Sequence, residues 1–166
     1  MTTPGPFDRT HRHPYPDRWM HMGARVYNDA AINVSSNTQT ALTFNQERYD
    51  IGGFHSTSSN TGRLTAPVAG VYGISGHVRF VSAADYTRIQ VFLTLNGTDT
   101  IAGINDFLAF GTGGVLRSVE TFYALAAGDY VALEVLQVNT AAAVLTITAT
   151  PAISPEFAIV YLGDTV

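Results

Sequence analysis

The chain has 166 residues, enough for one domain with a sizeable core, and only 13% of them are charged. The formal net charge is −4 and no basic run occurs beyond residue 22, which argues against a general nucleic-acid binder. The absence of cysteine excludes disulfides and thiolate metal sites, and no segment approaches the ~20 apolar residues of a membrane-spanning helix. A charge content of about half the usual share predicts either a surface partly covered by a partner or a neutral surface rich in Thr, Asn and Ser.

Residues 1–22 are predicted to form an extended arm. Four prolines preclude a regular helix or a central strand. The segment also contains the only tryptophan of the chain, whereas disordered tails are poor in aromatic residues. We therefore expect an arm that docks onto a partner through its aromatic and arginine side chains, with a disordered tail as the alternative. The predicted contact residues are Phe7, Arg9, Arg12, Tyr15, Arg18 and Trp19.

From Gly23 onward the pattern is almost wholly that of β-strands. The clearest strand covers residues 71–80, where large apolar side chains alternate with small or polar ones. Tyr72, Ile74, Val78 and Phe80 share one face, and Ser75, His77 and Arg79 share the other. Further strands are expected over residues 24–27, 40–44, 48–51, 88–95, 116–125, 130–138, 143–148 and 157–162. Asn96-Gly97 signals a hairpin turn, and residues 56–62 and 105–114 are expected to be loops. Nine or ten short strands without a convincing helix predict a sandwich or a barrel.

Three motifs occur in order along this pattern. They are Phe54 followed by RLTAPVAGVYGISGHV, the LAAGDYV turn that begins at Leu125, and the closing FAIVYLG strand. In these motifs the chain resembles the globular C1q/TNF-like jelly roll. Its GARVY opening and its ALTFN and ERYD segments are similar to the bacterial and phage versions of that domain. The chain departs from the family in having Ile74 where Phe is frequent, and no collagen-like triplets occur.

The resemblance implies a fold class and an assembly. The fold is all-β, a ten-stranded, two-sheet jelly-roll sandwich over residues 23–166, and its copies form a compact homotrimer. The resemblance also implies an inner sheet that holds the first strand, the last strand and the strands over residues 71–80 and 130–138. The outer face of that sheet is then expected to meet two neighbouring subunits.

The last strand favours an assembly on the evidence of its own residues. Both of its faces are apolar, whereas an antiparallel strand with one face in water alternates. A cyclic trimer covers such surfaces with heterologous contacts that close. The predicted trimer-interface residues are His77, Arg79, Glu134, Leu136, Val160 and Tyr161. Among them, His77, Arg79 and Glu134 are expected to form a polar cluster near the axis, with three separate solvated side chains as the alternative.

No catalytic, cofactor or metal site is expected. The sequence has no Gly-x-Ser-x-Gly nucleophile elbow. His11 and His13 offer only two imidazoles on an arm, which is a poor metal site. Asp99 and Asp106 are expected to flank a loop, and two carboxylates fall short of the roughly six to eight oxygens that surround calcium. We therefore expect a protein that is not an enzyme.

The sequence is best interpreted as a structural or adhesive component of a bacteriophage virion. The fold that it resembles is used for extracellular recognition, yet residues 1–22 lack the apolar run of a secretory signal. A virion protein is assembled in the host cytoplasm and released by lysis, which reconciles the two observations. We expect a trimeric capsid decoration or cement protein anchored by its arm, or a closely related head-fibre or tail-tip knob.

The expected partners are other copies of the chain, the major capsid protein or another virion protein, and, as a further candidate, a host-surface glycan. Neither nucleic acid nor a membrane is expected to bind. The alternative function is that of a bacterial C1q-like recognition module, which binds a glycan or a protein through residues 56–62 and 105–114.

Overall fold

The computed structural model describes residues 22–81, 86–106, 114–150 and 153–165. Within these ranges the chain forms an all-β sandwich of two sheets, as the strand pattern predicts. Its twelve described strands are β1 (Gly23–Tyr27), β2 (Ile32–Val34), β3 (Thr40–Ala41), β4 (Gln46–Ile51), β5 (Arg63–Thr65), β6 (Gly70–Phe80), β7 (Tyr86–Leu95), β8 (Asp99–Asp106), β9 (Val115–Leu125), β10 (Tyr130–Asn139), β11 (Leu145–Ile147) and β12 (Glu156–Gly163). Nine or ten strands were predicted, and the sequence pattern located nine of the twelve and missed β2, β5 and β8. β2 and β5 have three residues each, too few to show an alternation.

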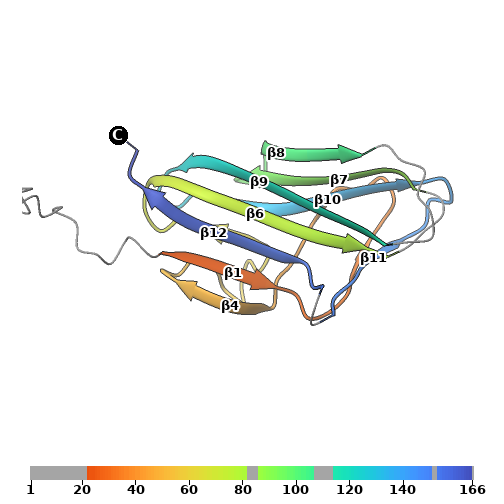
Figure 1. The fold of residues 1–166 in the computed structure, drawn as a ribbon, viewed down its shortest axis with the longest axis horizontal. Coiled ribbons are helices and arrows are strands. Elements are labelled where there is room, and N and C mark those ends of the chain that lie inside the picture. Colours follow the sequence, from red (N-terminus) through yellow and green to blue (C-terminus); the bar gives the residue numbers. More distant parts are fainter. Residues whose placement is uncertain (1–21, 82–85, 107–113, 151–152, 166) are drawn as a thin grey trace, which may run out of the picture.

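The larger sheet is organised around β6. Its seven strands include the path β2, β11, β6, β12, β1 and β4, and β9 pairs with β6 along the full length of both strands. Figure 1 shows β4, β1, β12, β6 and β9 lying side by side. The alternation predicted for residues 71–80 is confirmed, because Tyr72, Ile74, Val78 and Phe80 are buried while the side chains between them point away from the core.

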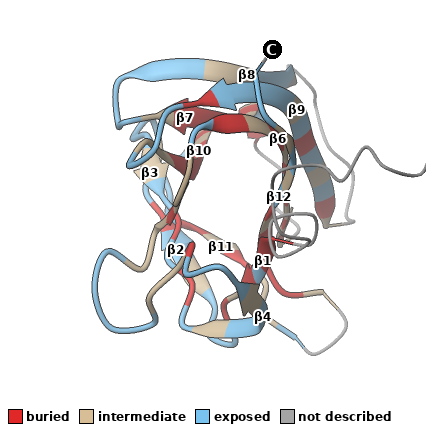
Figure 2. Ribbon diagram, turned by 90° about the vertical axis from the view of Figure 1, so that its left-hand side faces the viewer, coloured by how far each residue is buried: buried red, intermediate tan, exposed pale blue. Residues whose placement is uncertain are grey.

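The smaller sheet has five strands, with β3, β10, β7 and β8 in that order and β5 also paired to β10. The predicted Asn96-Gly97 turn joins β7 to β8, and both residues have positive φ, of 51° and 74°. The edge strands β4 of the larger sheet and β8 of the smaller sheet are largely exposed in Figure 2, whereas β10 is buried along most of its length. The core is therefore densest beneath the middle of each sheet.

The strand over residues 130–138 was expected beside residues 71–80, and that expectation is wrong because β10 pairs with β7 in the smaller sheet. The turn from β9 to β10 crosses between the sheets. Asp129 in this turn accepts hydrogen bonds from Asn96 Nδ2 at 2.9 Å and from the Ala126 N–H at 2.8 Å, and both bonds lower its pKa. Since Asn96 belongs to the β7–β8 hairpin, this carboxylate fixes the start of β10 to the smaller sheet.

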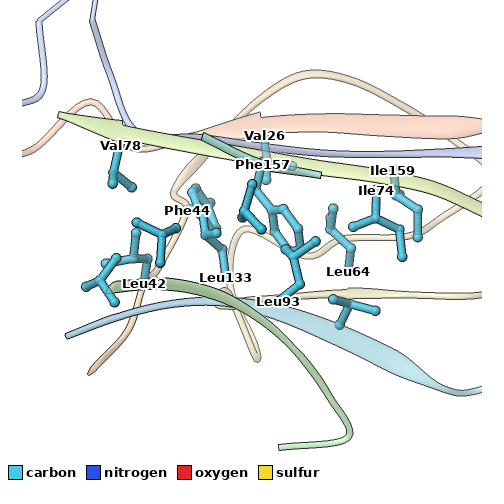
Figure 3. Close-up of a cluster of buried hydrophobic side chains, with 14 of the residues drawn as sticks. Val26, Leu42, Phe44, Leu64, Ile74, Val78, Leu93, Leu133, Phe157 and Ile159 are labelled. Carbon is cyan, nitrogen blue, oxygen red and sulfur yellow. The ribbon is translucent and has the colours of Figure 1, made fainter. Parts of the chain in front are cut away.

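The core lies between the two sheets and is built from the apolar set of each strand. Figure 3 shows Ile74 and Phe157 of the larger sheet facing Leu93 and Leu133 of the smaller one. Phe44, in the link between β3 and β4, places its ring centroid 5.7 Å from that of Phe157. Each such side chain contributes about 1.5–3 kcal/mol when it is fully buried.

Gln137 connects the two sheets by hydrogen bonds. Its side chain lies on β10 and is fully buried. Its Nε2 donates to the carbonyl oxygens of Val34 and Ala143, each at 3.0 Å, and its Oε1 accepts from Asn139 Nδ2 at 2.8 Å. Because Val34 belongs to β2 of the larger sheet, this one amide spans the sandwich.

We expect Gln137→Leu to lower the free energy of unfolding by about 2 kcal/mol, because the Val34 carbonyl loses the Gln137 donor and Asn139 loses an acceptor, while the side-chain volume is nearly kept. Urea denaturation followed by circular dichroism measures the loss. The matched control is Gln90→Leu on the outward face of β7, for which we expect a change within about 0.5 kcal/mol. Equal losses in the two variants would contradict a stabilising role for the Gln137 bonds.

Candidate functional site

The most distinctive surface is the side of the larger sheet that points away from the core, over β4, β1, β12, β6 and β9. We call it the outer face. Residues that lie opposite one another on adjacent strands form rows across it. The apolar row consists of Ile51, Gly23, Val160, Gly73 and Phe122. The charged row, next to it, consists of Tyr49, Arg25, Ala158, Ser75 and Glu120.

Phe122 dominates the apolar row. The residue is 77% exposed, and Ile51 and Val160 of the same row are exposed as well. The ring lies close to Gly73, where an added Cβ would stand 3.4 Å from Phe122 Cε1 and 3.2 Å from Val160 Cγ1. Single exposed apolar side chains are ordinary on protein surfaces, but a contiguous group marks an interaction site.

A shallow depression of about 520 Å³ lies across both rows. Small residues form its floor, since Gly73, Ser75 and Ala158 line it, while Tyr49 and Phe122 line it from the two margins of the outer face. The outer face is therefore concave between two aromatic side chains. Such a shape favours the reception of a protruding apolar group.

A buried carboxylate lies next to the charged row. Glu156 on β12 accepts hydrogen bonds from Arg25 Nε at 2.6 Å and from Arg48 Nε at 2.7 Å, and each arginine also forms an ion pair with it. The Arg48 guanidinium lies 4.5 Å from the centroid of the Tyr27 ring. Burial alone would raise the pKa of Glu156, but the hydrogen bonds and positive charges of Arg48 and Arg25 outweigh burial, and the pKa is lowered. The three strands β1, β4 and β12 are thus joined by charge as well as by backbone bonds.

The predicted interface residues are distributed over three parts of the sandwich. His77, Arg79 and Val160 point outward from the larger sheet. Tyr161 points into the core, where its ring centroid lies 5.4 Å from that of Tyr72, and its hydroxyl donates to Asp164 at 2.5 Å. The remaining two, Glu134 and Leu136, lie on β10 and point outward from the smaller sheet.

The expected polar cluster of His77, Arg79 and Glu134 does not form within a subunit, because β10 is not a neighbour of β6. Glu134 instead accepts hydrogen bonds from Gln39 Nε2 at 2.6 Å and from Thr94 Oγ1 at 2.8 Å. The contact of His77, Arg79 and Glu134 with another copy of the chain stays a prediction. The predicted contact residues of the arm lie outside the described residues.

Sequence reasoning missed most of the outer face. Arg25 and Glu156 are separated by 131 positions in the chain and Arg48 and Glu156 by 108, so no local sequence pattern could predict these contacts. Phe122 had a local signal, because Leu116 and Phe122 fall on the polar set of their strand, opposite Val115, Val119 and Leu125. An alternation broken by two large apolar residues was the available clue.

The metal and membrane predictions can be compared with the described ranges. There, no group of three His, Asp or Glu side chains is placed to hold a metal ion. The expectation that Asp99 and Asp106 flank a loop is wrong, because they stand at the two ends of β8. At the rise of a β-strand this places their Cα atoms about 24 Å apart, too far to share one calcium ion. No helix in the described part of the chain has the length and hydropathy needed to cross a bilayer.

Comparison with known proteins supports the fold. No protein-family model and no curated protein matches the chain. Among solved structures it is similar to the crystal structures of murine APRIL at pH 5.0 and pH 8.5, with 10% and 12% sequence identity, a TM-score of 0.63 for both, and coverage of 86% of this chain and 99% of the APRIL chains. It is also similar to the globular domain of zebrafish complement 1qA protein, with 16% identity, a TM-score of 0.56, and coverage of 87% of this chain and 99% of that domain. At these identities the likeness concerns the fold alone, which is the C1q/TNF-like jelly roll that the motifs predict.

We expect the contribution of Glu156 to stability to be lost in acid. Because its pKa is lowered in the folded protein, the stabilisation is complete above the ordinary Glu value of 4.5 and is lost as the pH falls through the folded pKa. At pH 7 we expect Glu156→Gln to cost about 2 kcal/mol through the loss of charge-assisted hydrogen bonds. Urea unfolding from about pH 7 to pH 3 should show this difference shrinking, whereas the exposed control Asp99→Asn should differ little from the wild type. A difference for Glu156→Gln that stays constant across this range would show that its charge is not responsible.

Proposed function

We propose that this chain is a non-enzymatic structural protein that forms a homotrimer through its outer face and serves in a bacteriophage virion as a capsid decoration or cement protein. One observation carries the self-association: a contiguous apolar row, with a phenylalanine that is 77% exposed, lies open on the surface of a single subunit. Apolar patches rimmed by polar residues are typical of protein–protein contacts. The low charge content of the chain agrees with a surface that is partly covered.

A closed ring suits the arrangement of the apolar row. Such a ring uses heterologous contacts, in which one patch of a copy meets a different patch of the next copy. The outer face has two such patches at its margins, Phe122 on β9 and Ile51 on β4, with Val160 between them. Rotation about an axis leaves the height of a residue along that axis unchanged. In a ring whose strands run along the axis, Phe122 of one copy therefore lies at the height of the apolar row of the next and can pack against it.

The position, composition and length of the arm support the proposal that the protein attaches to a shell. Met22 is buried, and its carbonyl oxygen accepts a hydrogen bond from the Tyr161 N–H at 2.9 Å, so the domain holds the chain directly before β1. The 21 residues that precede Met22 contain three arginines and three aromatic residues. An extended segment of this length spans at most about 70 Å. Each trimer would then cement neighbouring shell subunits with three arms, and a head-fibre or tail-tip knob is the nearest variant of this proposal.

We expect the wild-type chain to have three times its 17.8 kDa mass in solution. Phe122→Glu should shift it toward the monomer, because a carboxylate cannot be buried against the apolar row without a partner. Size-exclusion chromatography with light scattering measures both masses, and circular dichroism verifies folding. The control is Val144→Glu, which changes an exposed valine in the loop before β11 and should leave the mass unchanged. A monomeric wild type would refute the proposed trimer.

We expect removal of residues 1–21 to leave a folded trimer that no longer attaches to the shell. The cut keeps Met22 because of its place in the core. Sedimentation of purified shells with the added protein measures attachment. The matched variant is the full chain with Phe7, Tyr15 and Trp19 changed to alanine, which should also lose attachment. Normal sedimentation of the shortened chain with the shells would exclude an arm-anchored decoration protein.

One observation favours the alternative function, a recognition module that binds a glycan or a protein. The loop over residues 56–62 borders a depression of about 170 Å³ that Ser56, Ser59, Asn60 and Arg63 line. Hydroxyl, amide and guanidinium groups are suited to hydrogen bonding with sugar hydroxyls. Most of the second predicted loop, over residues 105–114, lies outside the described residues. Glycan binding that persists without the arm and is lost on changing Asn60 would support this function over attachment to a shell.

A further inference from the structure

The outer face carries opposite charges toward its two margins. In the charged row, Arg25 lies on β1 and Glu120 lies on β9, with Ala158 and Ser75 between them. Three strand spacings place the Cα atoms of Arg25 and Glu120 about 14 Å apart, too far for an ion pair within the subunit. Glu120 is exposed and makes no ion pair or hydrogen bond with any described residue.

The positive end of the row has unused capacity for hydrogen bonds. Arg25 and Arg48 share the single carboxylate of Glu156, which leaves a surplus of one positive charge. The side chain of Arg25 is 47% exposed and that of Arg48 is 39% exposed, whereas that of Glu156 is only 7% exposed. Each guanidinium has five N–H donors, and the contacts with Glu156 use only part of them.

We infer that Glu120 of one copy forms an ion pair with Arg25 of the next copy, with Arg48 beside it. This inference rests on the proposed self-association. Arg25 and Glu120 belong to one row, so a ring whose strands run along its axis brings them to the same height. The apolar row is the adjacent row on both strands, because Phe122 and Gly23 each lie two positions from Glu120 and Arg25. The same rotation therefore aligns the apolar contact and the charge contact.

This ion pair gives the assembly a direction and a register. Glu120 on β9 attracts Arg25 and Arg48 of a neighbour, while a contact that brought two copies of Glu120 together would be repulsive. A slip by one row toward the apolar row would place Glu120 at the height of Gly23 and Ile51, without a counter-charge, and the opposite slip would place it at the height of Glu156. Between the charged ends of the row, the small side chains of Ser75 and Ala158 line the depression, which leaves space for long side chains of a neighbour.

The test compares the assembly of charge variants of the full-length chain. Glu120→Gln removes the negative charge, and Glu120→Arg reverses it. Asp99→Arg makes the same reversal at an exposed site on β8, outside the charged row.

We expect the concentration at which half of the chains dissociate to rise about tenfold for Glu120→Gln and about a hundredfold for Glu120→Arg. Asp99→Arg should behave as the wild type, and Arg25→Gln combined with Glu120→Gln should dissociate no more readily than either single variant, because both changes remove the same ion pair. Light scattering over a concentration series measures these changes.

The outcomes separate the ion pair from the proposed trimer. If the wild type is trimeric and Glu120→Arg dissociates no more readily than Asp99→Arg, the ion pair is refuted while the trimer stands. If the effects of Arg25→Gln and Glu120→Gln on dissociation simply add in the double variant, Arg25 is not the partner. If the wild type is monomeric, the proposed self-association fails and the ion pair fails with it.

Discussion

The hydrogen-bonded register of β6 determines both which side chains form the core and which lie together on the outer face. This strand pairs with β12 on one side and with β9 on the other, and each pairing fixes which side chains lie opposite one another. A slip of one residue in either pairing would turn a set of core side chains to the surface. The same register that buries Tyr72 and Ile74 therefore aligns Gly73 with Phe122 and Ser75 with Glu120 on the outer face. The core and the candidate site follow from one constraint.

The buried carboxylate of Glu156 is the second feature on which the outer face depends. A buried charge is costly unless it is paired and hydrogen-bonded. Here Arg25 and Arg48 satisfy it from two neighbouring strands, and the stacking of Arg48 near Tyr27 holds one of these arginines in place. The surplus positive charge that results lies on the surface beside an apolar row. The outer face therefore offers apolar area that a partner can bury and a charge that favours a partner of opposite sign.

The candidate site was only partly predictable. Val160 was expected at an interface because both faces of its strand are apolar, and it is exposed on the outer face. Tyr161 was assigned to the same interface, but the period-2 alternation of the strand directs it into the core. Glu134 was assigned there on the assumption that β10 lies beside β6, and the turn at Asp129 instead carries β10 into the smaller sheet. The sequence indicated which positions were unusual, and it did not indicate which of them share a face.

By itself, the sequence determined that the chain is all-β, that residues 71–80 alternate between core and surface, and that Asn96-Gly97 makes a hairpin turn, since these properties depend on residues close together in the chain. The ordered motifs also identified the C1q/TNF-like jelly roll that solved structures support. Only the tertiary structure decided which strands are neighbours, and with that the rows of the outer face and the contact of Arg25 and Arg48 with Glu156. The physical reason is that a two-residue period tells on which face of a strand a side chain lies, whereas the choice of the adjacent strand depends on hydrogen bonds and packing between segments far apart in the chain, more than 100 positions apart for β1 and β12.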